Sequence, residues 1–394
     1  MNVTEVASDI LQQCLSKEEQ FLSLLKRMVE IETPSGDPES HKKLFKILEE
    51  ELHEVGYKTE HFPGKKSGGQ ILAKPRNSKK SSGQLLLGHV DTVWPKGTLK
   101  KMPFKRDGNV LTGPGIYDMK SGIAMMIVAF TVLKENGLIP ELEPVVFLDS
   151  DEEVGSDDSI EKLVQIAKSM ERVYVLEPSL DPEGKLKTRR KGSGHYDVHI
   201  SGRSAHAGIE PEKGRSAIVE LSYIIQKLNE LNDTVKGVSV NVGTIGGGTV
   251  SNVVAAESIA SVDVRVSTKK DAERIDKTIK SIEPTTPGVT LEITGEMRKL
   301  PMVQNDRNRT LWFAAKEVGS ELNLELEQGM SGGGSDGSYT TQHTATLDGL
   351  GAVGGGAHSP TEHILLKETL ERIALLTGML LLPGQKTNGK KESG

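Results

Sequence analysis

Three short apolar segments constrain the fold of this chain more than any other feature. They lie at residues 84–87, 144–148 and 173–176, and residues typical of turns bound each of them. Apolar runs of this length predict strands that are buried on both faces. Helical patterns at 119–136 and 159–169 lie between them. Because buried strands alternate with helices, we expect an α/β sheet covered by helices on both faces.

A different pattern occupies residues 191–301. The expected order there is strand, helix, strand, strand, helix, strand, which is the ferredoxin-like βαββαβ unit. Its elements are expected at 196–200, 215–232, 238–245, 259–266, 270–282 and 289–293. Helical patterns resume near 310–322 and 367–382. We therefore expect a discontinuous α/β domain, formed by residues 1–190 and 302–394, that is interrupted by an α+β domain; the polar tail at 385–394 is typical of a disordered terminus.

The composition excludes several classes of protein. The chain has 394 residues, of which 36% are hydrophobic and 26% charged, as expected for two or three globular domains. Its net charge of −6 argues against a nucleic-acid partner. One cysteine, Cys14, permits neither an intrachain disulfide nor a cysteine zinc site.

The sequence also bears on where the protein resides. The first residues lack the basic and apolar regions of a secretory signal. The longest apolar runs, such as 123–132, are too short to span a bilayer. We therefore expect a cytoplasmic protein with no membrane partner, although a chain from which a signal had been removed would look the same.

Histidine and acidic residues follow the ends of the apolar segments. His89 and Asp91 come after the first, and the acidic run 149–153 comes after the second. Glu177 follows the third. In open α/β sheets, ligands bind at the carboxyl ends of the strands. These side chains are therefore expected to meet at one edge of the sheet.

Each of these features has a plain alternative. A histidine two residues from an aspartate also fits a structural role. Asp118 lies in a Gly/Pro-rich loop near a helix start, where it could cap the helix or bridge two metal ions. Adjacent acids often form a solvated turn, although crowding them at a buried strand end is costly unless a cation compensates. His358 lies in a glycine-rich loop.

The sum of these features favours a metal centre. Two histidines and several carboxylates without sulfur suit Zn²⁺, with Mn²⁺ or Co²⁺ as alternatives. A pair of such ions could polarise a carbonyl group and supply hydroxide near neutral pH.

These motifs resemble those of the M20 family of metallopeptidases, especially its glutamate carboxypeptidase (carboxypeptidase G-like) branch. The resemblance covers nearly the whole chain and follows the family order. It is carried by the segments 85–92, 113–122, 149–153, 173–178, 201–208 and 354–360. It implies a two-zinc exopeptidase-type catalytic domain with an inserted lid or dimerisation domain.

The resemblance also implies roles for the residues of the catalytic domain. His89, Asp118 and Glu177 would hold one zinc ion, and Asp118 would bridge to a second one. The ligands of the second would be Asp118, Glu153 and His358. Glu152 would be the general base that takes a proton from the attacking water and returns it to the leaving amine. Asp91 would stand behind His89.

Four residues of the inserted region, and Gly333 in the α/β domain that follows it, resemble the family's substrate-contacting positions. His206 would steady the oxyanion, donated by the neighbouring subunit in dimeric members; an ordinary loop histidine on a monomeric lid is the alternative. Asn252 and Arg265 resemble binders of the substrate carboxylate, although Arg265 could equally face solvent on an alternating strand. Gly333 lies in a loop whose backbone N–H groups could hold a carboxylate. Arg298 could contribute to recognition of an acidic side chain.

The resemblance implies a zinc-dependent, homodimeric hydrolase. It would cleave a peptide or N-acyl amide bond next to a C-terminal amino acid carboxylate, as glutamate carboxypeptidases do. The alternatives are an N-acyl-amino-acid deacylase, similar to acetylornithine deacetylase or succinyl-diaminopimelate desuccinylase, and a dipeptidase. An inactive binding or regulatory homologue would lack a metal ligand or the base, and none is missing here. The sequence leaves open the substrate, its acyl group, the native metal and the pathway.

Overall fold

The computed structural model describes residues 3–78, 82–180 and 182–384. The expected tail, 385–394, lies outside the described residues. The chain divides into two compact units. The first comprises Met1–Thr188, Gln304–Met330 and Ser335–Gly394, and the second comprises Arg189–Val303 and Ser331–Gly334.

Three short segments lie in a different unit from the one expected. Residues 189–190, 302–303 and 331–334 were expected in the discontinuous α/β domain, yet they belong to the second unit. For residues 331–334, the reason is a set of hydrogen bonds: the Arg190 guanidinium donates to the carbonyls of Gly333 and Gly334 at 3.2 and 3.0 Å. The amide of Lys191 donates to the carbonyl of Ser331 at 3.0 Å.

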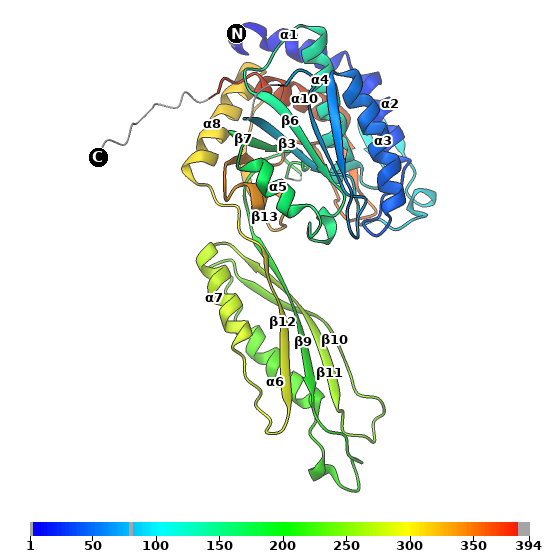
Figure 1. Cartoon of the computed structure of the whole chain (residues 1–394), viewed down its shortest axis with the longest axis vertical. Coiled ribbons are helices and arrows are strands. Elements are labelled where there is room, and N and C mark those ends of the chain that lie inside the picture. The colour runs from blue at the N-terminus through cyan, green and yellow to red at the C-terminus, as the bar shows by residue number, and fades with distance from the viewer. Residues whose placement is uncertain (1–2, 79–81, 181, 385–394) are drawn as a thin grey trace, which may run out of the picture. The chain divides into compact units, whose positions relative to one another are not determined.

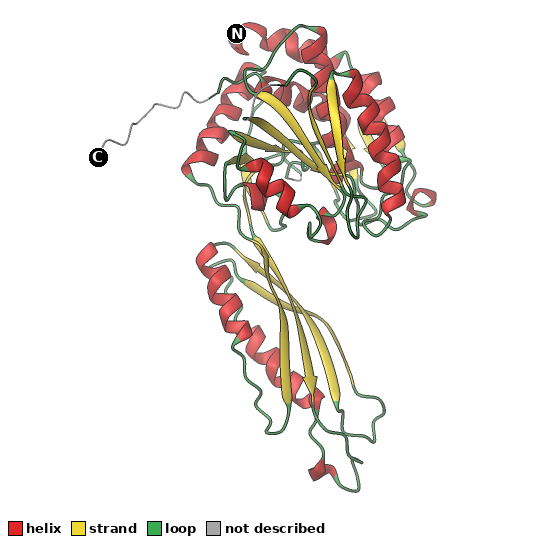
Figure 2. Ribbon diagram, in the orientation of Figure 1, coloured by secondary structure: helices red, strands yellow, loops and turns green. Residues whose placement is uncertain are grey.

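A six-stranded sheet forms the centre of the first unit (Figures 1 and 2). Its order is β1 (Tyr57–Phe62), β2 (Gln70–Pro75), β6 (Glu143–Asp149), β3 (Gly83–His89), β7 (Arg172–Val175) and β14 (Ala345–Leu347). The strands β6, β3, β7 and β14 are parallel, whereas β2 pairs antiparallel with both β6 and β1. The three expected strands are therefore neighbours at the centre of the sheet, and the predicted α/β class is confirmed.

Helices cover both faces of this sheet. Leu86 and Val146 pack into a core cluster with one set of helices. This set consists of α1 (Val3–Leu15), α2 (Glu18–Val29), α3 (Pro38–Glu54), α4 (Ser121–Glu135), α8 (Asp306–Glu321) and α10 (Leu366–Leu380). Leu85 and Phe147 point to the other face, toward α5 (Ile160–Ala167) and α9 (Gly337–Thr340). The side chains alternate along each strand, so both faces are apolar.

One helical segment within the described residues, Ile116–Glu135, is long and apolar enough to cross a membrane by length and composition. The apolar run 123–132 was judged too short to span a bilayer, but the helical segment is longer because residues on both sides of that run also belong to it. However, 89% of the tested window is buried inside the protein, where α4 packs against α2 and α10. The core helix of a folded domain passes the same test.

Two small sheets remain, one within the first unit and one shared by the two units. The strands β4 (Lys105–Asp107), β5 (Val110–Thr112), β15 (Gly354–Gly355) and β16 (His363–Leu365) pair in the order β15-β16-β5-β4. This pairing brings the loop after β15 beside the segment that leads into α4. A two-stranded ribbon of β8 (Leu186–Arg190) and β13 (Gln328–Ser331) lies where the chain passes between the units.

The second unit is a four-stranded antiparallel sheet with two helices on one face (Figure 1). Its chain order is β9 (Gly192–Ser201), α6 (Ala217–Asn229), β10 (Ser239–Gly247), β11 (Glu257–Val266), α7 (Lys269–Lys280) and β12 (Thr290–Lys299). The spatial order is β10-β11-β9-β12. Alternating residues such as Val198 and Val262 form its core beneath the helices. This is the βαββαβ order expected from the sequence.

Candidate metal centre

Three parallel strands end at one edge of the central sheet, and the first group of candidate ligands follows their ends. His89 is the last residue of β3, and it lies opposite Asp149, the last residue of β6. Glu152 and Glu153 follow β6 in a single helical turn, η3 (Glu152–Val154). Glu177 lies two residues beyond β7. The register of the sheet therefore gathers these side chains.

Asp118 and His358 reach the same place from loops. Asp118 lies in the turn η2 (Ile116–Lys120), and it does not cap α4, whose N-cap residue is Lys120. Its carboxylate lies between the two histidines instead. The Oδ1 atom is 3.3 Å from Nε2 of His89, and Oδ2 is 3.3 Å from Nε2 of His358. This arrangement fits a bridging ligand and sets the capping alternative aside.

The outer carboxylates complete two overlapping groups. Oε1 of Glu177 is 3.5 Å from Nε2 of His89, and Oε2 of Glu153 is 3.3 Å from Nε2 of His358. Ligand atoms also lie within 4.8 Å of one another in two sets, His89 with Glu152 and Glu177, and His89 with Asp118 and Glu153. The second set places Glu153 near His89 as well as near His358. The distances between individual atoms divide the candidate ligands as the resemblance implies, with Glu177 beside His89 and Glu153 beside His358.

The residues fit a metal pair by an independent criterion. Nε2 of His89, Oδ1 of Asp118 and Oε1 of Glu153 are buried and lack a hydrogen-bond partner among the residues that the structure describes. Such atoms are rare in folded proteins unless an ion or water satisfies them. Imidazole nitrogens with carboxylate oxygens suit zinc, manganese or cobalt.

The carboxylates change the protonation of both histidines. Burial lowers the pKa of His89, but Asp118, Asp91 and Glu177 outweigh it and raise that pKa well above 6.5. Asp118 and Glu153 raise the pKa of His358 to about 11. Burial would raise the pKa of Asp118, yet the two histidines hold it below its ordinary value of 3.8. The carboxylates thus favour positive charge in this site. Metal ions would supply that charge in place of the protons on His89 and His358.

Asp91 does more than stand behind His89. Its main-chain carbonyl accepts a hydrogen bond from Nδ1 of His89 at 3.0 Å, which leaves Nε2 free to bind metal. Its carboxylate accepts the backbone N–H groups of Glu152 and Glu153 at 3.3 and 3.2 Å, and the hydroxyl of Ser35 at 2.7 Å. Asp91 therefore orients the imidazole and also fixes the turn that carries Glu152 and Glu153.

His206 and Asn252 lie together at one end of the second unit. The carbonyl of Asn252 accepts the amide N–H of Ala207 at 2.9 Å. Nδ1 of His206 accepts the amide N–H groups of Gly208 and Ile209 at 3.1 and 3.2 Å. The ring proton of neutral His206 therefore sits on Nε2, on an exposed side chain that can donate a hydrogen bond.

Arg265, Arg298 and Gly333 lie at the opposite end of that unit. Arg265 pairs with Ser193 near the start of β9, and Arg298 flanks the same end of β9 on the other side. The carbonyl of Gly333 is bonded to Arg190, which precedes β9. Asn252 and Arg265 were both expected to bind the substrate carboxylate. The antiparallel register places them at opposite ends of the second unit within one chain.

The distance between these two ends follows from the length of β11. Arg265 and Glu257 are eight residues apart along this strand, which corresponds to roughly 26 Å. Asn252 lies five residues beyond Glu257, where the pairing of the two chain segments continues. One small substrate cannot contact both Asn252 and Arg265 of the same chain.

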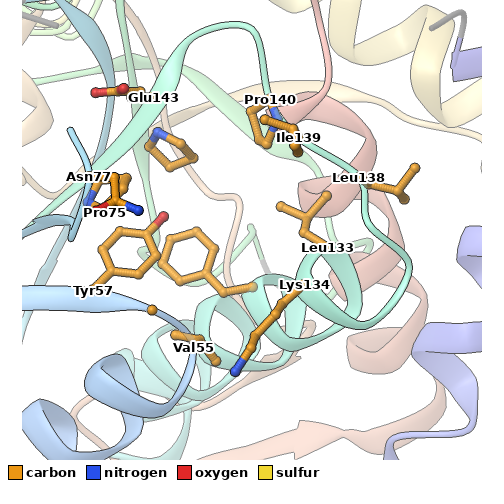
Figure 3. A pocket seen from close by; sticks show the side chains of 13 residues that line it. Val55, Tyr57, Pro75, Asn77, Leu133, Lys134, Leu138, Ile139, Pro140 and Glu143 are labelled. Atoms are coloured by element: carbon orange, nitrogen blue, oxygen red, sulfur yellow. The ribbon is translucent and has the colours of Figure 1, made fainter. Parts of the chain in front are cut away.

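A separate pocket opens at the other edge of the central sheet (Figure 3). It has a volume of about 260 Å³, and its lining includes the side chains of Tyr57, Phe130, Leu133 and Ile139. Glu143, at the start of β6, also lines it, whereas the metal ligands follow the end of β6. None of its lining residues belongs to the metal centre.

The sequence analysis missed several residues that support the centre. Ser35 donates to Asp91, and Nζ of Lys187 lies 3.6 Å from Oε2 of Glu177. Glu362 accepts four hydrogen bonds beside Asp118. Ser35 and Glu362 lie far from their partners in the sequence, whereas Lys187 lies only ten residues after Glu177, and none of the three follows one of the apolar segments. Spacing therefore could not have identified them.

The α/β fold and this group of candidate metal ligands are those of a metallohydrolase. The sequence pattern that describes peptidase family M20/M25/M40 matches residues 85–382. The chain belongs to this family, and it is an enzyme of the metallopeptidase and amidohydrolase type.

Known proteins support this assignment. Carboxypeptidase G2 of Pseudomonas sp. (strain RS-16) is 30% identical over 371 residues, which cover 89% of this chain and 86% of that protein. An M20 family metallo-carboxypeptidase from Sulfolobus solfataricus has the same fold, with a TM-score of 0.73 and 18% identity over 92% of this chain and 98% of its own. A dinuclear metal binding M20 peptidase of Bacillus subtilis gives a TM-score of 0.66 with 15% identity, over 93% and 98% of the two chains.

Proposed function

We propose that this enzyme is a zinc-dependent hydrolase that releases a C-terminal amino acid, glutamate foremost, from a small peptide or an N-acyl amino acid. The convergence of the five ligands at the carboxyl edge of the sheet supports this proposal. The similarity to carboxypeptidase G2 over most of both chains supports the position of the cleaved bond. Two zinc ions bound by these residues would polarise the scissile carbonyl and supply hydroxide near neutral pH.

The closeness of Glu152 to His89 and Glu177 supports its assignment as the general base. Glu152 begins the turn η3, and its neighbour Glu153 lies against His358. Asp91 holds the backbone of both glutamates, so Glu153 can serve as a ligand while Glu152 moves protons. Glu152 takes a proton from the attacking water and returns it to the leaving amine.

Arg265 is suited to bind the substrate carboxylate. Its Nε and Nη2 atoms donate to the two carboxylate oxygens of Asp263 at 2.9 and 3.0 Å. Arginine recognises a terminal carboxylate with the same bidentate geometry, so the substrate carboxylate would take the place of Asp263. Arg298 and Gly333 lie at the same end of the unit and would add selectivity for an acidic side chain.

The separation of Arg265 from His206 supports a homodimer. An extended dipeptide spans at most about 7 Å, far less than the roughly 26 Å length of β11. If Arg265 serves the metal centre of its own subunit, His206 and Asn252 must come from a second copy. Helix α6 also exposes Ile218, Val219 and Tyr223 by 47%, 47% and 40%, as an apolar contact surface would.

A substrate panel tests the proposal. It contains peptides that end in glutamate, the same peptides ending in other residues, N-acetyl and N-succinyl amino acids, and dipeptides. We expect the highest kcat/KM for glutamate-terminated substrates with a free carboxylate. Turnover confined to acetylated amino acids would assign the protein to the deacylases instead, and turnover confined to dipeptides would assign it to the dipeptidases.

A further inference from the structure

Glu362 is a fully buried carboxylate beside the metal centre, and it accepts four hydrogen bonds. Its Oε1 atom accepts the backbone N–H groups of Tyr117 and Asp118 at 2.9 and 3.1 Å. Its Oε2 atom accepts the backbone N–H of Gly115 at 3.0 Å and the indole N–H of Trp94 at 2.6 Å. All four donors are N–H groups, so the site matches a carboxylate specifically.

These bonds satisfy backbone N–H groups at the start of a helical segment, where the helix itself supplies no acceptor. The segment just before α4 departs from helical geometry at Asp118, where φ is −114° and ψ is 96°. Buried amides in such a segment need acceptors from elsewhere, because an unpaired buried N–H group is costly. Glu362 accepts the N–H groups of three residues in this segment. It lies 244 residues beyond Asp118 in the sequence.

We propose that Glu362 is a positioning residue for the metal centre. Its carboxylate fixes the backbone of the 115–118 segment and thereby holds the Asp118 carboxylate between His89 and His358. Trp94 is tied to the same carboxylate, so the position of its indole changes together with the order of this segment. The inference rests on the two-metal function proposed above, but zinc binding tests it without any substrate.

Glu362→Gln is the informative substitution because it preserves the size of the side chain. Each oxygen of Glu362 accepts two N–H groups, so the amide NH₂ of a glutamine would face two N–H donors. Two hydrogen bonds would be lost without a change of volume. Trp94→Phe removes only one of the four bonds and leaves the three backbone contacts. The effect of Glu362→Gln is therefore expected to exceed that of Trp94→Phe.

Glu220 offers a matched control in the second unit. It is also fully buried, and its carboxylate accepts the backbone N–H groups of Thr285 and Thr286 at 2.7 and 2.8 Å. Glu220→Gln therefore disturbs the same kind of contact away from the ligands. Both variants are expected to unfold at lower denaturant concentration than the wild type. Only Glu362→Gln is expected to weaken metal binding.

The experiment measures zinc affinity of the full-length, metal-free protein by competition with a chromogenic chelator. For Glu362→Gln we expect at least one zinc to bind about 10- to 100-fold more weakly, which is the usual effect of losing a residue that orients a metal ligand. Circular dichroism verifies that the variant is folded. A folded Glu362→Gln protein that binds two zinc ions with wild-type affinity would overturn the inference.

Tryptophan fluorescence gives a second test, which does not require the Glu362→Gln variant to fold. The chain has two tryptophans, Trp94 and Trp312, and Trp312 is buried on α8. In a Trp312→Phe background, zinc addition is expected to shift the emission of Trp94. Emission that does not respond to bound zinc would contradict the coupling. A wild-type protein that binds no zinc would reject the proposed function and this inference with it, whereas unchanged binding by the variants rejects the inference alone.

Discussion

Mixed dimers of two inactive variants test how the active site is assembled. His206→Ala removes the oxyanion donor, and Glu152→Gln removes the base, so each variant alone is expected to lose most of its activity. In a mixed dimer, one site combines Glu152 of the first chain with His206 of the second and is intact. The other site lacks both groups.

The expected recovery follows from the geometry of the second unit. Because β11 separates Arg265 from His206 by roughly 26 Å, one site is expected to draw these residues from two chains. Random reassociation of equal amounts gives half mixed dimers, each with one intact site of two. The mixture should therefore regain about a quarter of wild-type activity in a symmetric dimer.

The assay mixes the two variants after reversible dissociation, or co-expresses them with different affinity tags, and measures kcat on a glutamate-terminated peptide. A mixture of Glu152→Gln with Asp118→Asn serves as the control, because both changes lie in the same unit and no combination restores a site. Activity that stays at the level of the parent variants would show that His206 serves its own chain, and it would refute the reasoning.

Three further predictions concern single residues. Asp91→Asn turns an amide toward the N–H groups of the η3 turn, and kcat or zinc affinity is expected to fall about 10- to 100-fold; wild-type values of both would contradict its orienting role. Arg265→Lys keeps the charge and loses the fork, so KM for a glutamate-terminated substrate should rise about 10-fold or more with a smaller change in kcat, whereas an unchanged KM would exclude Arg265 from carboxylate binding. Burial lowers the pKa of His41 below 6.5, so the unfolded chain binds more protons there and stability is lost as the pH falls through 6.5. Urea unfolding of the metal-free protein at pH 7.5 and 5.5 should show a larger loss for the wild type than for His41→Gln, and equal losses would contradict this.

The central strands could be predicted from the sequence because they are buried on both faces. Short apolar runs such as those of β3, β6 and β7 are most simply explained by strands that are buried on both faces. The outer strands carry weaker patterns: β1 reads Tyr-Lys-Thr-Glu-His-Phe and is half exposed, and β14 has only three residues. Their places depend on pairing with partners that sequence periodicity does not reveal.

The candidate ligands His89, Glu153 and Glu177 could be predicted because they follow ends of parallel strands, which the sheet brings together; Asp118 and His358 lie in loops, and only their motifs indicated them. Supporting residues such as Glu362 contact the centre from distant parts of the chain, so no spacing identifies them. The lid residues show a different limit. Asn252 and Arg265 each match a motif, but only the antiparallel register of β11 reveals that one chain holds them far apart.

The most direct test of a metal-dependent hydrolase with Glu152 as its base is the Glu152→Gln variant in its zinc-loaded form. Asp118, Glu153 and the other ligands are unchanged, so metal analysis is expected to find two zinc ions per subunit, as in the wild type. The account predicts that kcat falls by about 10² to 10⁴, the usual contribution of a general base. Activity near the wild-type level with both zinc ions bound would contradict it.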